Sequence, residues 1–99
     1  MRSELREYYI VVRSAPGVAK AWTPVDPTNG YTYDLEKLPK RGKFGLESRA
    51  QVAVDKCRAD TATHLGHLRR IGDAHAKSMI PFYEGLEFRV AKVAITVDL

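Results

Sequence analysis

The sequence predicts a small α+β domain of two layers, in which a three-stranded, mainly antiparallel sheet packs on one long helix. Segments rich in β-branched and aromatic residues lie near both ends of the chain, at 7–14 and 86–99. Between them, apolar residues recur with helical spacing over about six turns. A chain of 99 residues has room for one core, so we expect residues 1–99 to form a single domain.

The first predicted element is a hairpin made of residues 7–14 and 18–23. Residues 7–14 (EYYIVVRS) are apolar at nearly every position, which favours a central strand. The Pro-Gly pair at 16–17 suits a type II turn, because glycine takes a positive φ without steric cost. Pro24 is expected to end the second strand, since proline removes a donor from the ladder. Trp22 should then be buried where the hairpin meets the helix layer.

A segment rich in turn residues follows the hairpin. The pairs Asp-Pro at 26–27 and Asn-Gly at 29–30 are turn signals. Residues 34–38 predict a single helical turn, which Pro39 stops. Residues 40–45 (KRGKFG) are basic and are expected to be irregular.

One long helix is predicted to begin at Ser48, because Ser48 and Gln51 fit a capping box. Its end is predicted by the arginines at 69–70, which suit the helix dipole, and by Gly72 at the C′ position. The apolar positions of the helix fall on one side and define the core stripe: Ala50, Ala53, Val54, Cys57, Thr61, Leu65, Leu68 and Ile71.

The C-terminal part of the chain is less regular. Residues 73–81 suit either a second short helix or a loop, and both alternatives stay open. Residues 86–99 predict a long terminal strand in which Phe88 and Val90 lie on one face, whereas Val93, Ile95 and Val97 lie on the other. A β-bulge near Ala91 would bring both sets to the same face.

The composition favours a cytoplasmic protein. No apolar run approaches the roughly 20 residues that span a bilayer, and the charged N-terminus lacks the apolar region of a signal peptide. The single cysteine, Cys57, excludes an internal disulfide, and its place in the core stripe favours a buried side chain over a nucleophile. The net charge of +4 suits an acidic or nucleic-acid partner.

No motif specifies a reaction. Asp60, His64 and His67 line one edge of the helix with spacings of four and three residues, which can bind a metal, with His75 as a further ligand. The same spacing also suits an ordinary pair of Asp60 with His64 at the solvated margin. We therefore expect no catalytic residue, no bound metal and no cofactor. A small metal-dependent enzyme is kept as a third hypothesis.

The best candidate for a partner-binding site combines aromatic and basic residues after the hairpin. Tyrosine and tryptophan dominate interface hot spots, and basic residues contact acidic groups. The predicted partner-binding residues are Tyr31, Tyr33, Lys40, Arg41 and Lys43. Two simpler interpretations remain open, in which the tyrosines cover a small core and the basic run only makes the loop soluble.

The same region carries a W-x-P…GYT-x-D-L run, followed by a basic Gly-Lys-Phe element and the predicted helix. This pattern resembles small bacteriophage accessory proteins, in which such a run is followed by an AG-x-Y/F element and a helix. The residues that match here are Trp22, Pro24, Gly30, Tyr31, Thr32, Asp34 and Leu35. Residues 41–44 (RGKF) stand in place of the second element, with Arg41 where the alanine is expected. The resemblance implies an accessory protein expressed in an infected bacterium, such as an inhibitor of host defence of the anti-CRISPR type.

These observations predict a protein that binds a host protein or a ribonucleoprotein complex in the host cytoplasm. The second hypothesis is a nucleic-acid-binding accessory protein that uses the basic and aromatic residues. No membrane partner is expected. The oligomeric state is left open, a homodimer included.

Overall fold

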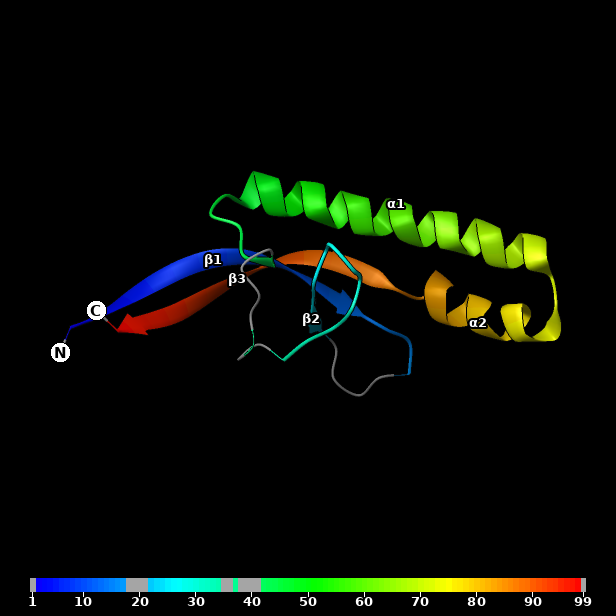
Figure 1. Ribbon diagram of the computed structural model, residues 1–99, viewed down its shortest axis with the longest axis horizontal. Helices are drawn as coiled ribbons and strands as arrows, with labels where there is room; N and C mark the ends of the chain where they lie inside the picture. The colour runs from blue at the N-terminus through cyan, green and yellow to red at the C-terminus, as the bar shows by residue number, and fades with distance from the viewer. Residues whose placement is uncertain (1, 18–21, 35–36, 38–41, 99) are drawn as a thin grey trace.

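The computed structural model of the protein describes residues 2–17, 22–34, 37 and 42–98. In chain order its elements are β1 (Ser3–Ser14), β2 (Thr23–Val25), α1 (Glu47–Ile71), α2 (Ala74–Glu84) and β3 (Glu87–Asp98). The strands form an antiparallel sheet of order β2-β1-β3, and α1 lies along one face of it (Figure 1). The predicted two-layer α+β architecture is confirmed.

β1 is the central strand, as its apolar run predicts. It pairs with β3 along its whole length, from Ser3 opposite Asp98 to Ser14 opposite Glu87. Its pairing with β2 covers only residues 11–13. Residues 3–8 and 93–98 therefore form a two-stranded extension, called the ribbon below, which reaches past the start of α1 (Figure 1).

The predicted bulge near Ala91 is wrong, because the register between β1 and β3 is continuous. The two apolar sets of β3 have different surroundings instead. Phe88 and Val90 belong to the core beneath α1, whereas Ala91 and Val93 line a hollow on the opposite face of the sheet. The sheet thus has apolar residues on both faces, and no bulge is needed to reconcile them.

The second strand lies later in the chain than predicted. Pro24 does not end β2 but sits within it, opposite Val12. The carbonyl of Pro24 accepts a hydrogen bond of 3.2 Å from the N–H of Tyr33, on the side away from β1. Because the N–H and C=O of one strand residue point the same way, the missing donor of Pro24 costs no bond to β1. Residues 18–21 of the predicted strand lie outside the described residues.

Helix α1 begins without the predicted capping box. Its N-cap is Leu46, which makes no side-chain cap, and Ser48 already lies in the first turn. The side chain of Gln51 donates instead to Asp55 at 3.1 Å. The C-terminal prediction is confirmed, since Gly72 is left-handed with φ 68° and its N–H bonds to the carbonyl of Leu68.

The core lies under the first half of α1. It consists of the buried residues Val11, Val25, Ala53, Val54, Cys57 and Phe88. Farther along, α1 leaves the sheet and α2 runs beside it (Figure 1). The predicted core stripe is therefore buried at its start and at Leu68, only half-buried at Leu65 and exposed at Ile71.

The open alternative for residues 73–81 is resolved as a helix, α2. The carboxylate of Asp73 caps it by accepting the N–H of Ala76 at 2.7 Å. Ala76 is buried against the rest of the fold. The end of α2 brings Phe82 and Tyr83 close to the sheet, where they take part in the site described below.

Val54→Ala is expected to lower the free energy of unfolding by about 2–3 kcal/mol, because the Val54 side chain is fully buried and its loss leaves a cavity. Val52 offers a matched control on the same helix, since its side chain is 68% exposed. Val52→Ala should cost less than about 0.5 kcal/mol. Denaturant titration of both variants checks this, and equal losses would mean that α1 faces the sheet differently.

Candidate functional site

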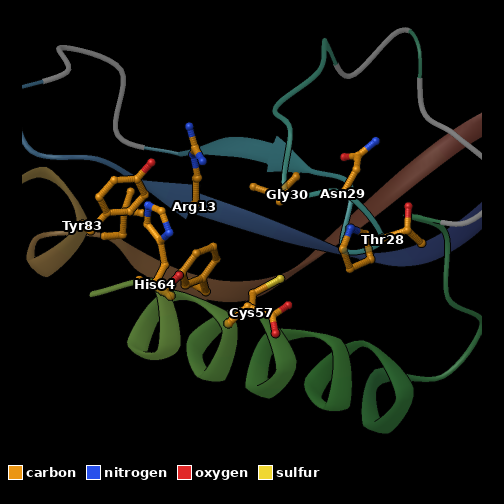
Figure 2. A pocket seen from close by; sticks show the side chains of 13 residues that line it. Arg13, Thr28, Asn29, Gly30, Cys57, His64 and Tyr83 are labelled. Carbon is orange, nitrogen blue, oxygen red and sulfur yellow. The ribbon is translucent and has the colours of Figure 1, made fainter. Parts of the chain in front are cut away.

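A cleft of about 320 Å³ opens where the β2 hairpin, the two helices and the sheet meet. Its walls are the turn at residues 27–30, the face of α1 from Cys57 to His64, and Tyr83 at the end of α2. Arg13 of β1 completes it. In Figure 2, Arg13 and the turn lie across from Cys57 and His64 of α1, with Tyr83 beside His64.

The turn at the cleft is held by hydrogen bonds of its own side chains. The Asp26 carboxylate accepts from the backbone N–H and the hydroxyl of Thr28, at 2.9 and 2.6 Å. The Asn29 side-chain oxygen accepts from the N–H of Tyr31 at 2.9 Å. Gly30 has a φ of 76°, which suits glycine, and its N–H bonds to the carbonyl of Asp26. The turn signals at 26–27 and 29–30 are thus confirmed.

Lys56 connects this turn to α1. Its ammonium donates to the carbonyl of Pro27 at 3.4 Å and to the carboxylate of Asp60 at 2.8 Å. The hydrogen bond that Lys56 donates to Asp60 raises the pKa of Lys56. The negative charge of Asp60, on the cleft wall, is consequently already matched by a cation of the same helix.

Arg13 is the charged group that distinguishes the cleft. The residue is half-buried, and its guanidinium lies 6.0 Å from the centre of the Phe82 ring. It makes no ion pair with any residue that the structure describes. A second hollow of about 560 Å³ also borders Arg13 and extends the cleft towards Tyr31 and Phe82. The guanidinium therefore stands between two adjoining depressions.

Aromatic side chains surround this arginine and form the rim of the site. Tyr31 is 75% exposed and Phe82 is 37% exposed. Tyr83 packs edge-to-face on Phe82 at 5.2 Å and on His64 at 4.6 Å between ring centres. The aromatic rim, which we define as Tyr31, Phe82 and Tyr83, thus combines a fixed cluster with one freely accessible ring.

Cys57 reaches the cleft wall but is buried, as its place in the core stripe predicts. Burial raises the pKa of its thiol. The charge of nearby Lys56 lowers this pKa and the charge of nearby Asp60 raises it, but both effects are smaller than that of burial. Because the thiolate is the reactive form, the raised pKa makes Cys57 a poor nucleophile at neutral pH.

The structure separates the residues predicted from sequence to bind a partner. Tyr31 is on the aromatic rim, whereas Tyr33 lines the hollow on the opposite face of the sheet. The Lys43 ammonium lies 5.4 Å from the centre of the Tyr8 ring, near the ribbon. The predictions for Lys40 and Arg41 lie outside the described residues.

Two further aromatic residues of this region, Trp22 and Tyr33, lie on the face of the sheet away from α1. Trp22 is half-buried there, under the guanidinium of Arg89 at 4.5 Å, and not against the helix layer as predicted. The hydroxyl of Tyr33 is buried without a hydrogen-bond partner among the described residues. Burial raises the pKa of Tyr33, and the charge of Asp26 raises it further. Both residues therefore cover the sheet.

The histidines and acids considered for a metal have other neighbours. Asp60 is bonded to Lys56, and His64 packs on Tyr83. Within the described ranges, no three His, Cys, Asp or Glu side chains come together in a way that could hold a metal ion.

Sequence reasoning did not identify Arg13, Phe82 and Tyr83 as site residues. One signal was available for the two aromatics, because Asp73 is a good N-cap and predicts a helix through residue 83. Arg13 gives no such signal. A cation near the end of an apolar strand is ordinary, and only the tertiary structure places it between aromatic rings.

No protein-family model, curated protein or solved structure matches this chain. Among the described helices, none is both long and apolar enough to cross a membrane.

Ionisation of the Cys57 thiol is expected to lower the free energy of unfolding as the pH becomes alkaline. In the unfolded chain the thiol ionises near its ordinary pKa of about 8.5, whereas the folded protein keeps it protonated to higher pH. This contribution to stability is complete below about pH 8 and is lost progressively as the pH rises through the higher, folded-state pKa. Denaturant titrations of wild type and Cys57→Ala should therefore converge at high pH. An identical pH dependence of the two proteins would contradict the burial of the thiol.

Proposed function

We propose that this protein acts by binding another macromolecule, and that the cleft with its aromatic rim is the binding surface. The observation that supports this most is Arg13. Arg13 is half-buried, its guanidinium faces the Phe82 ring, and it makes no ion pair with any described residue, so its charge has no counter-ion there. A carboxylate of a partner would supply one, because the planar fork of arginine matches it in two hydrogen bonds.

The aromatic rim supports the same proposal. Tyrosine, tryptophan and arginine are the residues enriched at the energetic centres of protein interfaces. Here Tyr31 and Arg13 border one hollow together with Phe82, and the hydrogen-bonded turn at 27–30 holds one side of it. The matching partner segment carries an acidic side chain next to an apolar or aromatic one.

A protein partner fits this surface better than a nucleic acid. Binding of a phosphate backbone uses several cations that follow the strand. In the cleft Arg13 is accompanied by the acid Asp60, and Lys56 is already bonded to that acid. Lys37 and Lys43, the described lysines of the basic segment, line neither depression.

The identity of the partner is proposed from the sequence resemblance. The W-x-P…GYT-x-D-L run at residues 22–35 is similar to that of phage accessory proteins. On that basis the target is a host protein or a ribonucleoprotein complex in the cytoplasm of an infected bacterium. Inhibition of a defence system, as by anti-CRISPR proteins, is the most specific form of this proposal. Such an inhibitor works in proportion to its amount and needs no catalytic group.

Arg13→Ala and Tyr31→Ala are each expected to weaken partner binding by about 30-fold or more, the effect of losing a hot-spot residue of about 2 kcal/mol. The measurement is capture of partners from bacterial lysate by the tagged protein, with and without nuclease, followed by titration of the captured partner. Arg70→Ala is a matched control, because Arg70 is exposed on α1 and borders neither depression.

The same assay compares the cleft with the site predicted from sequence. Reversal of the charges at Lys40, Arg41 and Lys43 should affect binding less than Arg13→Ala does. The opposite ranking would move the site to the basic segment and overturn the role of the cleft. Loss of capture after nuclease treatment, with a steep decrease of affinity in salt, would instead support the nucleic-acid hypothesis.

A further inference from the structure

β3 forms one edge of the sheet over its whole length. Only β1 pairs with it, and no strand in the described part of the chain lies on its other side. The carbonyl of Phe88 accepts a hydrogen bond from Arg58 at 3.0 Å, whereas the backbone N–H and C=O groups of the edge at residues 92–98 are open to another strand. Charged residues often protect such edges, but residues 93–97 (VAITV) contain none.

The part of this edge that lies in the ribbon, residues 93–98, is not covered by another layer among the described residues of the fold. It reaches past the start of α1, so the helix does not cover it (Figure 1). Leu5 on β1 is 65% exposed there. Two strands alone are marginally stable in water, and further strands or a covering layer are needed to stabilise them. A partner that extends the sheet would supply both hydrogen bonds and apolar contact.

We propose that this partner is a second copy of the same chain, paired antiparallel through β3 about a twofold axis at Ile95. Residues 92–98 of one copy then lie opposite residues 98–92 of the other, and the sheet continues across the axis. Because this segment is at the ribbon end, the helices of the two copies lie at opposite ends of the shared strands and do not collide.

The charges on β3 select this alignment. Lys92 lies opposite Asp98 of the second copy, and the pair occurs twice about the axis. Within one chain Lys92 bonds to Glu7 at 2.9 Å, whereas Asp98 has no ion pair among the described residues. In an antiparallel pair, Lys92 can lie opposite only those residues of the second copy that share its face of the sheet. Apart from Asp98, these residues are either uncharged or Lys92 itself. Opposite charges facing each other across strands are stabilising, and like charges are not.

The apolar residues agree with the same alignment. Val93 lies opposite Val97 of the second copy, and Ile95 lies opposite Ile95. These side chains share the face of the sheet away from α1, where each is half-buried in one chain. Pairing produces a continuous row of β-branched residues across the middle strands, the arrangement that stabilises cross-strand pairs.

Two charge variants test the proposal by sedimentation over a concentration series. Wild type is expected to be a dimer. Asp98→Lys sets lysine opposite lysine, and Lys92→Asp sets aspartate opposite aspartate, so each variant alone should be a monomer. An equimolar mixture of the two variants restores both opposite-charge pairs and should form a heterodimer. Glu87→Lys is the matched control, because it changes an exposed charge of the same strand outside residues 92–98.

Far-ultraviolet circular dichroism and thermal unfolding establish that the variants are folded. A monomeric wild type at every concentration would overturn the proposal. A wild-type dimer that both variants leave intact would also overturn it, as would variants that fail to associate when mixed. A single cysteine at residue 95, in a Cys57→Ala background, provides an independent check of the axis: Ile95→Cys should form an intermolecular disulfide under oxidising conditions, whereas Leu5→Cys in the same background should not.

Discussion

The pairing of β1 with β3 is the interaction on which the rest of the structure depends. It joins the two ends of the chain in one continuous ladder, from Ser3 opposite Asp98 to Ser14 opposite Glu87. Everything between these strands, including both helices, must then leave from one end of the ladder and return to it. α1 and α2 consequently lie towards that end and leave the opposite end as the uncovered ribbon (Figure 1).

The elements that sequence predicts well are those set by local chemistry. The central strand follows from the apolar run at 8–12, and the end of α1 follows from Gly72, whose left-handed backbone suits glycine. The buried start of the core stripe follows from helical spacing. In each case a few neighbouring residues determine the outcome, so no knowledge of the rest of the fold is needed.

The predictions that proved wrong depend on which face or edge is covered, and sequence does not state this. Pro24 is tolerated in β2 because its nitrogen points away from β1. The bulge near Ala91 is unnecessary because both faces of the sheet carry apolar residues. The site shows the same limit. Of the predicted residues, Tyr31 is at the cleft, whereas Tyr33 lies on the other face of the sheet. Their spacing of two residues would place both on one face in a regular strand, so the sequence pattern does not predict this separation.

The two proposed interactions use opposite ends of the same ladder, and this has a consequence for binding. Arg13 lies opposite Phe88 at the helix end, whereas Lys92 and Asp98 lie in or beside the ribbon. Dimerisation through the ribbon would therefore leave both clefts open and place them at the far ends of one extended sheet. A target with two copies of the recognised segment at a matching spacing would be bound through both clefts, and the second contact would form within the complex at a high effective concentration. If both proposed interactions occur, a small chain with a small core would gain affinity from its assembly, without a larger interface on either copy.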